Sequence, residues 1–339
     1  MDSTIHILGL GNLGKLVAHS LATKPDPPPL TLLLHRPNLY EMTKAKGPKI
    51  GIHYDGVWNW EGQYNAELVS MDNPPSPLDV KYISNLIVTT KSHKTAEALS
   101  MIKHRFTPLS TIIFIHNGMG VVGEVNKRVF PDPNERPYYL FGIASHGVYR
   151  TDDFTAVFAG HGSVILGDPR GDIEKTSHGS YLLQQVIESK LLGASEVSWN
   201  EFKLLQLQKL AVNAVINPLT ALNNCLNGMI VDSSMVGGMR SDFDGLISEV
   251  SQVFCSLPEL EGIPGSKERF SRESLRNAIL NVASATAQNR SSMLQDVSKG
   301  SETEIHYING YIVRKAQELG IECPVNRRMV ADILAVAAK

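Results

Sequence analysis

Cysteine is scarce in this sequence, which has only three among its 339 residues. Cys225, Cys255 and Cys323 are odd in number, lie far apart and show no metal-ligand spacing. This pattern excludes a disulfide framework and predicts reduced thiols in a reducing compartment. We therefore expect no metal site.

Long hydrophobic runs and an excess of one charge are also missing. No apolar run approaches the roughly 20 residues that span a bilayer, and the chain enters an apolar strand by Ile5 without an arginine-rich presequence or signal. The formal net charge is −2 and there is no long basic run, which argues against nucleic acid as the main partner. We expect a cytoplasmic protein with no membrane or nucleic-acid partner.

The composition that remains is that of an ordinary globular protein, with 42% hydrophobic and 19% charged residues. A length of 339 residues is long for a single hydrophobic core. The default expectation is therefore two domains.

A glycine-rich turn follows the first apolar run of the chain. Thr4–Leu8 predicts a strand, Gly9, Gly11 and Gly14 form a GxGxxG pattern, and an amphipathic helix is predicted directly afterwards. In this context the first glycine permits the tight turn, the second lets the backbone approach a pyrophosphate, and the third lets helix and strand pack closely. The helix N-terminus would supply N–H groups to the phosphates. The stretch predicts a dinucleotide site.

The second predicted strand, residues 30–34, is followed by Arg36. A site that prefers NAD would place Asp or Glu near this point to hold the ribose 2′-hydroxyl. An arginine suits a 2′-phosphate instead, through charge-assisted hydrogen bonds. We therefore predict NADP (NADPH) as the cofactor; the alternative is that Arg36 is a solvated strand end.

Four polar or glycine positions fall just beyond the carboxyl ends of predicted strands. Lys91 follows the strand predicted at 86–90 and Asn117 follows the one at 111–115, as Gly9 and Arg36 follow the first two. Ligands bind at this rim in open α/β sheets. Residues 138–148 and 155–166 predict further strands that complete the sheet, while residues 48–72 predict a hairpin or an insertion.

From about Ser198 onward the hydrophobic period changes from two to 3.6, and strands disappear. Helices are predicted near 200–217, 240–256, 270–290, 302–320 and 325–338. We therefore predict an α/β fold: an N-terminal Rossmann-type dinucleotide-binding domain, residues 1–196, followed by an all-α substrate and catalytic domain, residues 197–339, with a cleft between them.

One predicted helix, Leu204–Leu222, is apolar apart from three polar residues at four-residue steps. Lys209, Asn213 and Asn217 therefore lie along one helix face. Pro218 is expected to end or kink the helix directly afterwards. A lysine among apolar residues needs a partner or a ligand, and burial lowers its pKa. Spacing alone leaves a solvated stripe or a buried ion pair as alternatives.

Several motifs in chain order resemble those of one family. They are GLGNLG at the start, TTKSHKT around Lys91, HNGMG around Asn117, KLAVNAVINPLTAL around Asn213, CLNG at Cys225–Gly228, SSMLQD at Ser291–Asp296 and TEIHYING at Thr303–Gly310. Together they resemble the ketopantoate reductase family of the 6-phosphogluconate dehydrogenase-like superfamily. The resemblance covers essentially the whole chain. It implies a two-domain NADPH-dependent 2-dehydropantoate 2-reductase of pantothenate biosynthesis.

The resemblance also implies roles for individual residues. Lys209 matches the catalytic lysine, the general acid, and Glu304 matches the catalytic-site glutamate. The positions that match substrate contacts are Asn117, Asn213, Asn217, Asn227 and Ser292. The positions that match cofactor contacts are Gly9, Gly11, Asn12, Leu13, Gly14, Arg36, Lys91 and Asn117.

The sequence departs from the commoner family pattern in three places. Asn12 and Leu13 stand in the glycine loop where a small residue is usual, and His306 stands where an aspartate often follows the glutamate motif. The N-terminal half is longer around residues 24–29 and 48–66. The first two differences bear on cofactor packing and leave the reaction intact.

Structural and functional alternatives stay open at this point. Asn227 before a glycine also fits a helix C-terminal turn, and Ser291-Ser292 fits a helix cap. The whole chain also fits a reductase of another branched or hydroxylated 2-oxo acid, or a non-catalytic NADPH-binding regulator that kept the fold. A homodimer is the base-rate expectation for assembly.

Overall fold

The computed structural model describes residues 3–69, 80–170, 180–231 and 238–337. The chain packs into two compact units. The α/β unit contains residues 1–116 and 121–202, and the helical unit contains residues 117–120 and 203–339. The predicted domain boundary between residues 196 and 197 stays a prediction. The short segment 117–120 lies between two parts of the α/β unit in the sequence, but it packs with the helical unit.

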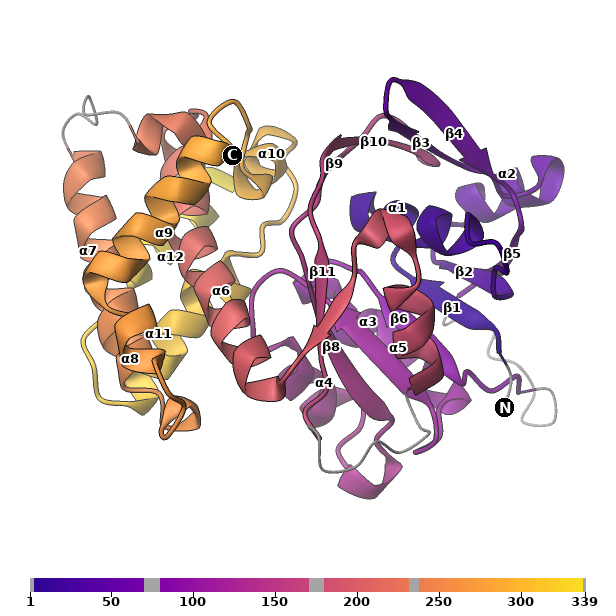
Figure 1. The fold of residues 1–339 in the computed structure, drawn as a ribbon, viewed down its shortest axis with the longest axis horizontal. Coiled ribbons are helices and arrows are strands. Elements are labelled where there is room, and N and C mark those ends of the chain that lie inside the picture. The colour runs from indigo at the N-terminus through magenta and orange to yellow at the C-terminus, as the bar shows by residue number, and fades with distance from the viewer. Residues whose placement is uncertain (1–2, 70–79, 171–179, 232–237, 338–339) are drawn as a thin grey trace. The chain divides into compact units, whose positions relative to one another are not determined.

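An eight-stranded sheet forms the centre of the α/β unit (Figure 1). In spatial order its strands are β12 Ser195–Val197, β11 Val164–Gly167, β8 Tyr138–Ala144, β7 Thr111–Ile115, β6 Asn85–Val88, β1 Ile5–Leu8, β2 Leu30–Leu34 and β5 Tyr64–Leu68. All neighbours are parallel except β11 and β8. Strands β1, β2, β6 and β7 are buried at every residue, as a parallel sheet covered on both faces requires.

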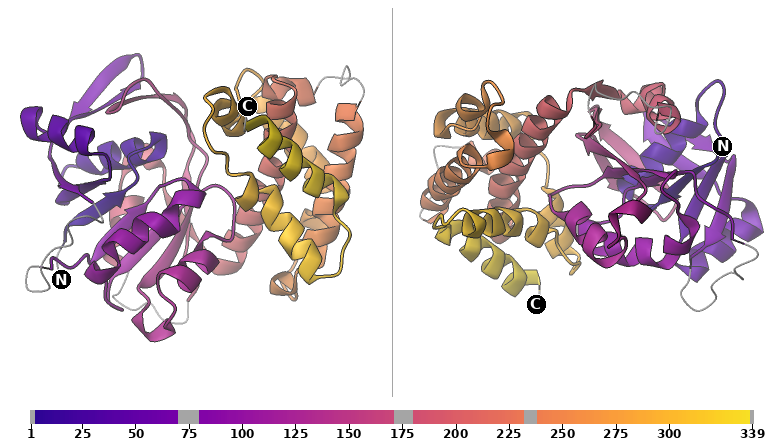
Figure 2. Two further views of the ribbon diagram at one scale, coloured as in Figure 1. Left: turned by 180° about the vertical axis from the view of Figure 1, so that it is seen from behind. Right: turned by 90° about the horizontal axis from the view of Figure 1, so that it is seen from below.

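Helices cover the two faces of this sheet. They are α1 Asn12–Ala22, α2 Pro37–Lys46, α3 Ser92–Ile102, α4 Val121–Arg128 and α5 Ser180–Ile187, with short 3₁₀ turns at Lys103–Arg105, Pro133–Glu135 and Lys190–Leu192. From β1 the chain moves to β2 on one side, and from β6 to β7 on the other. Because such crossovers are right-handed, α1 and α3 lie on opposite faces (Figures 1 and 2). The strand order reverses between β1 and β6, which makes their carboxyl ends the switch point where ligands bind.

A second, four-stranded sheet corrects one sequence expectation. It contains β4 Val57–Glu61, β3 Ile50–Tyr54, β10 Thr155–Gly160 and β9 Gly147–Arg150, in that order. The hairpin predicted within residues 48–72 is confirmed as β3–β4, and residues 70–72 lie outside the described part. The single strands predicted at 138–148 and 155–166 are wrong, because each divides between the two sheets.

Glycines permit that division. Gly147 of β9 pairs with Gly160 of β10 after a register shift that follows Phe158, the irregularity that bends a strand pair. A Cβ on Gly162 would lie 2.5 Å from the backbone nitrogen of His146. Only glycine allows this close approach, and beyond it the chain returns to the first sheet as β11.

Helices make up the second unit (Figure 1). They are α6 Trp199–Leu222, α7 Gly238–Cys255, α8 Ser266–Arg269, α9 Arg272–Ala285, α10 Ser292–Ser298, α11 Asn309–Glu318 and α12 Pro324–Ala337, with 3₁₀ turns at η5 Asn227–Ile230, η6 Pro258–Leu260 and η7 Ile305–Tyr307. The predicted α/β-then-helical fold is confirmed. Within the described ranges, no helix is long and apolar enough to cross a membrane.

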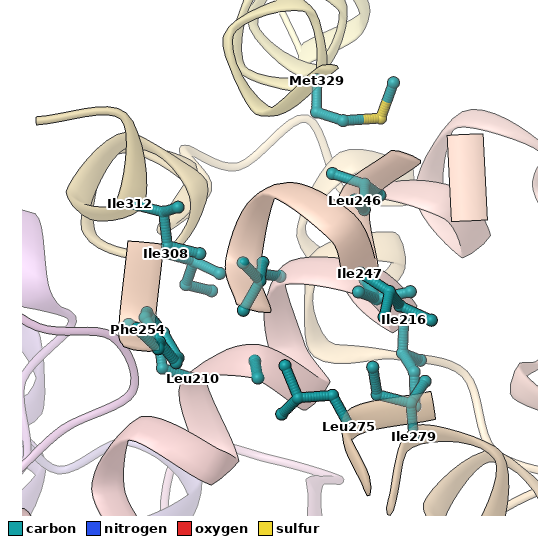
Figure 3. Close-up of a cluster of buried hydrophobic side chains, with 14 of the residues drawn as sticks. Leu210, Ile216, Leu246, Ile247, Phe254, Leu275, Ile279, Ile308, Ile312 and Met329 are labelled. Carbon is teal, nitrogen blue, oxygen red and sulfur yellow. The ribbon is translucent and has the colours of Figure 1, made fainter. Parts of the chain in front are cut away.

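The core of the helical unit gathers around α6. Leu210 and Ile216 of this helix are buried in one cluster with Leu246 and Phe254 of α7 and Ile279 of α9 (Figure 3). Side chains from α11 and α12 complete the cluster. Burial on several sides explains why the sequence of α6 is apolar nearly all round.

Pro218 lies inside α6 and does not end it, contrary to one of the two outcomes expected. A proline has no N–H, so the carbonyl of Ala214 loses its helical partner. Asn309 of α11 replaces that partner: its Nδ2 donates to the Ala214 carbonyl oxygen over 2.8 Å. The helix therefore continues for another turn, to Leu222.

Candidate functional site

The glycine loop has the geometry that a pyrophosphate requires. Gly9 has a φ of +102°, and a Cβ there would lie 2.6 Å from the backbone nitrogen of Thr90. A Cβ on Gly14 would collide with the carbonyl oxygen of Gly9, so only glycine lets α1 approach the loop. At Gly11, by contrast, a Cβ would meet no atom within 4 Å. The three glycines thus provide a turn, an open face and close packing, which fits a dinucleotide.

The loop is joined to the end of β6 at the switch point. The N–H of Thr89 donates to the Leu8 carbonyl over 2.9 Å, and its hydroxyl donates to the Gly9 carbonyl over 2.6 Å. Lys91, two residues later, precedes the first turn of α3 with an exposed side chain. The N-termini of α1 and α3 therefore lie next to each other with their positive dipole ends, an arrangement suited to a negatively charged ligand.

Arg36 lies beyond β2, immediately before α2, and is half-buried. Its Nη2 donates to Asp153 Oδ1 over 3.2 Å. Asn12 at the start of α1 donates through Nδ2 to the Val148 carbonyl over 3.1 Å, while Leu13 packs against the core of the α/β unit. Both residues of the glycine loop that depart from the family pattern, Asn12 and Leu13, are thus held by contacts within the protein.

Sequence reasoning missed Lys15 in the first turn of α1. This lysine is buried, and its Nζ donates to the carbonyls of Asp152 over 2.6 Å and Thr155 over 2.9 Å. Burial, reinforced by the positive charge of Arg150, lowers the pKa of Lys15 to about 8. A lysine directly after the third glycine was the available signal, but its partners are more than 130 residues away in sequence.

In the helical unit, α6 carries Lys209, Asn213 and Asn217 at successive turns of one face. Lys209 and Asn213 are half-buried, and Asn217 is buried. Burial lowers the pKa of Lys209 to about 8, and the negative charge of Glu304 acts in the opposite direction. Glu304 is itself buried, immediately before η7. The structure therefore brings together the two predicted catalytic residues, a titratable cation and its counter-charge.

The HNGMG motif around Asn117 and the TEIHYING motif at Thr303–Gly310 lie far apart in the sequence, but they are in contact in the helical unit. The N–H of Met119 donates to the Tyr307 carbonyl over 2.7 Å. Gly118 has a φ of +76°, and a Cβ there would lie 2.5 Å from the same carbonyl oxygen. The segment that carries Asn117 is thus fixed against the turn that follows Glu304, and only glycine permits the contact.

Two of the predicted substrate asparagines have buried polar atoms without a hydrogen-bond partner in the described part of the chain. They are Nδ2 of Asn217 and Oδ1 of Asn227. The other amide atom of Asn227, Nδ2, donates to Thr286 Oγ1 over 2.9 Å. Buried polar groups are nearly always paired, so these two atoms are candidates for contacts with a bound polar ligand.

The two serines at the start of α10 differ in role. Ser291 is the N-cap: its hydroxyl accepts the N–H of Leu294 over 3.1 Å and the hydroxyl of Thr220 over 2.7 Å. The cap interpretation therefore holds for Ser291. Ser292, the predicted substrate contact, is the first residue of α10 and is exposed.

Sequence reasoning also missed a polar network behind α6. Asn309 Nδ2 donates both to the Ala214 carbonyl and, over 2.9 Å, to Asn326 Oδ1. The buried carboxylate of Glu249 accepts from Nδ2 of Asn326 and from the backbone N–H groups of Val325 and Asn326 at the start of α12. A proline in an apolar helix was the available signal, because it requires an outside donor.

No group of three or more potential metal ligands occurs among the residues that the structure describes. All three cysteines are free thiols. Burial raises the pKa of the Cys323 thiol, and the adjacent Glu249 raises it further.

Comparison with known proteins identifies the family. The model for ketopantoate reductase PanE/ApbA matches residues 5–171, and the model for its C-terminal region matches residues 201–337. A probable 2-dehydropantoate 2-reductase of Schizosaccharomyces pombe is 30% identical over 97% of this chain and 95% of that protein. The chain belongs to the ketopantoate reductase family.

Other proteins similar to this member of the ketopantoate reductase family are named for other substrates. The ketoisovalerate reductase BEA2 of Gibberella fujikuroi is 27% identical over 94% of this chain and 79% of that protein. The ternary structure of D-mandelate dehydrogenase with NADH and anilino(oxo)acetate matches 98% of each chain with a TM-score of 0.72 at 19% identity. At this identity the match shows a shared fold. The dehydrogenase in that structure is bound to the nicotinamide cofactor NADH. The present chain is an oxidoreductase of this family.

Proposed function

We propose that this protein reduces 2-dehydropantoate to pantoate with NADPH, using Lys209 as the proton donor. The observation that carries the proposal is the position of Lys209 on α6, with its pKa lowered by burial and supported by Glu304, above Asn213 and Asn217. Reduction of a ketone needs a hydride at carbon, a proton at oxygen, and neutral groups that hold the rest of the substrate. The helical unit offers the last two.

Lys209 acts on the carbonyl oxygen. Negative charge develops there as the carbonyl carbon accepts the hydride, and a cationic ammonium group stabilises that charge before its proton forms the hydroxyl. Glu304 keeps the ammonium group charged, since its negative charge raises the pKa of Lys209 against burial. The amides of Asn117, Asn213, Asn217 and Asn227 and the hydroxyl of Ser292 provide hydrogen bonds without added charge.

The α/β unit holds the cofactor in this proposal. When bound, NADPH supplies the hydride. Gly9, Gly11 and Gly14, with the start of α1, bind the pyrophosphate, and Asn12 and Leu13 fix the loop. Arg36 binds the 2′-phosphate of the adenosine ribose, and Lys91 adds positive charge beside the loop. The ordered glycine loop and its open face at Gly11 support this assignment.

A second candidate function is the reduction of another 2-oxo acid. It is favoured by the likeness to a ketoisovalerate reductase at 27% identity, close to the 30% identity with the 2-dehydropantoate reductase. Both substrates need the same proton donor and hydride, and they differ in the groups that the asparagines would contact. A non-catalytic regulator is less well supported, because it would have no use for a lysine and a glutamate coupled in this way.

The test follows the loss of NADPH absorbance as 2-dehydropantoate is added to the wild type, Lys209→Ala and Lys203→Ala. Lys203 lies on the same helix, and its Nζ donates to the Glu259 carbonyl, so its loss serves as the control. We expect turnover in the wild type and in Lys203→Ala, and a loss of about a hundredfold or more in Lys209→Ala with NADPH binding intact. No turnover of 2-dehydropantoate, with turnover of 2-oxoisovalerate, would replace the first candidate by the second.

A further inference from the structure

The hairpin formed by β9 and β10 lies against the glycine loop. Three hydrogen bonds hold it there: Asn12 Nδ2 donates to the Val148 carbonyl, and Lys15 Nζ donates to the carbonyls of Asp152 and Thr155. Lys15 is only 1% exposed, so its two bonds are shielded from water. The turn between these strands, residues 150–155, is therefore a fixed part of the predicted cofactor site.

Two charged side chains of this turn, Arg150 and Asp153, form a cluster with Arg36. Asp153 Oδ1 accepts from Arg36 Nη2 over 3.2 Å and from Arg150 Nη2. Two guanidinium groups thus share one carboxylate oxygen. Like charges at such short range repel each other unless an anion lies between them. Asp153 is that anion in the absence of a ligand.

The cluster is accessible to a ligand. The side chains of Arg36 and Arg150 are 39% and 48% exposed, and that of Asp153 is 21% exposed. Each guanidinium group has five N–H donors, of which a single carboxylate oxygen uses one. A phosphate dianion carries twice the charge of a carboxylate and offers three oxygens, so it satisfies two arginines better than Asp153 does.

We propose that Arg150 is a second arginine of the 2′-phosphate site and that Asp153 is a built-in counter-ion, which the phosphate displaces. The β9–β10 hairpin would then set the preference for NADPH over NADH together with Arg36. This inference rests on the proposed use of NADPH. It adds to that proposal two residues that lie outside the glycine loop and the second strand.

The two residues have opposite effects on binding. Removal of Arg150 takes away one charge-assisted contact at a partly exposed site, for which we expect about tenfold weaker binding of a 2′-phosphate. Asp153→Asn keeps the side-chain shape but removes the competing charge, so we expect several-fold tighter binding. A nucleotide without the 2′-phosphate should not distinguish these variants from the wild type.

The experiment is calorimetric titration of the full chain with adenosine 2′,5′-bisphosphate and with adenosine 5′-monophosphate. The variants are Arg36→Ala, Arg150→Ala and Asp153→Asn, and Arg128→Ala is the matched control, because Arg128 is an exposed arginine paired with Glu124 on α4. We expect the ratio of the two affinities to fall in the first two variants, to rise in the third, and to stay at the wild-type value in the control.

The outcomes separate this inference from the proposed function. A wild type that does not prefer the bisphosphate would overturn the NADPH assignment itself. A wild type that prefers it, with the ratio lowered by Arg36→Ala but unchanged by Arg150→Ala, would overturn the role of Arg150 alone. Weaker bisphosphate binding by Asp153→Asn would show that the carboxylate positions the arginines and does not compete with the phosphate.

Discussion

Lys209 is subject to two opposing influences: burial lowers its pKa to about 8 and Glu304 acts against that shift. The proposed reduction uses the protonated lysine. We therefore expect kcat/KM for ketone reduction to be level below about pH 8 and to fall about tenfold per pH unit above it. Oxidation of the hydroxy acid uses the neutral lysine and should rise over the same range. Steady-state rates in both directions give this profile.

Glu304→Gln tests whether the glutamate acts through the lysine. The substitution removes the charge that raises the pKa of Lys209, so the midpoint of the pH profile should move below its wild-type value. A lower rate with an unmoved midpoint would mean that Glu304 contacts the substrate and leaves the lysine unaffected. Lys209→Ala is the control, because it should lack this titration altogether.

His19 is a second residue whose environment fixes its charge. It is completely buried in α1, and its Nδ1 lies 3.3 Å from the Ile50 carbonyl. Burial lowers its pKa from 6.5 to about 4, although the Ile50 contact acts against the shift. Between these values the unfolded chain binds the proton and the folded chain does not. Stability is therefore full above about pH 6.5 and falls as the pH drops toward 4.

We expect this residue alone to remove about 3 kcal/mol of stability from the α/β unit across that range. The measurement is the urea midpoint at several pH values for the wild type and His19→Gln. The variant should show a flatter dependence on pH, whatever its stability at neutral pH. An equal slope in both proteins would assign the acid sensitivity to other groups.

Residue-level inference from the sequence succeeded where the relevant spacing was short. Lys209, Asn213 and Asn217 were placed on one helix face by their four-residue steps alone, and the structure confirms that α6 is a helix over all three. The contacts of Lys15 with Asp152 and of Arg36 with Asp153 were missed, because each joins residues more than 110 positions apart in sequence. No local pattern reports such pairs. Their positions depend on a register between sheets that only the folded chain defines.

At the scale of single elements, α6 depends on α11. Asn309→Ala would leave the Ala214 carbonyl and Asn326 Oδ1 buried without this donor, at a cost of about 2 to 4 kcal/mol. Pro218→Ala restores an N–H to the Ala214 carbonyl within the helix. We therefore expect Asn309→Ala to cost about 1 to 2 kcal/mol less in the Pro218→Ala background.

A double-mutant cycle measured by urea unfolding of the helical unit checks this expectation. Additive effects of the two substitutions would show that the carbonyl of Ala214 is not the shared partner. The cycle also reports on the site, since residues 213 and 217 adjoin this carbonyl and the proline. Asn309→Ala could lower kcat, and Pro218→Ala could return it to the wild-type value. That result would show that the hydrogen bond from Asn309 to the Ala214 carbonyl positions Asn213 and Asn217.

Helices and strands with a clear hydrophobic period were predictable from the sequence. Strands that end where the backbone bends from one sheet into the other were not. The helical segments and the strands at the glycine loop follow directly from apolar spacing and turn residues. The stretches 138–148 and 155–166 have a continuous strand pattern, yet each divides between two sheets at glycines where the backbones approach closely. The pattern of a strand does not encode which sheet it joins.

At the scale of the whole molecule, the residues that the structure describes form one large hydrophobic core in each unit. The three tryptophans, Trp58, Trp60 and Trp199, all belong to the α/β unit, and the sequence of the helical unit contains none. Tryptophan fluorescence should therefore follow unfolding of the first unit, and far-UV circular dichroism should be weighted toward the second. We expect the two transitions to differ.

Adenosine 2′,5′-bisphosphate should raise the fluorescence transition more than the circular dichroism transition, because a ligand stabilises the unit that binds it. At a hundredfold excess over Kd the expected stabilisation is about 2.7 kcal/mol. Coincident transitions that shift together would show that the chain unfolds as a single cooperative unit. The proline-to-alanine and histidine variants above would then be compared by one common midpoint.

The bond from Asn309 to the Ala214 carbonyl also has a consequence for synthesis. Its two residues are 95 positions apart. At a ribosomal rate of about 5 to 20 residues per second, the donor leaves the ribosome roughly 5 to 20 s after the acceptor. During that interval the proline-containing turn of α6 must rely on water for its missing hydrogen bond. Helix α6 of a nascent chain would thus lack this hydrogen bond until Asn309 had left the ribosome.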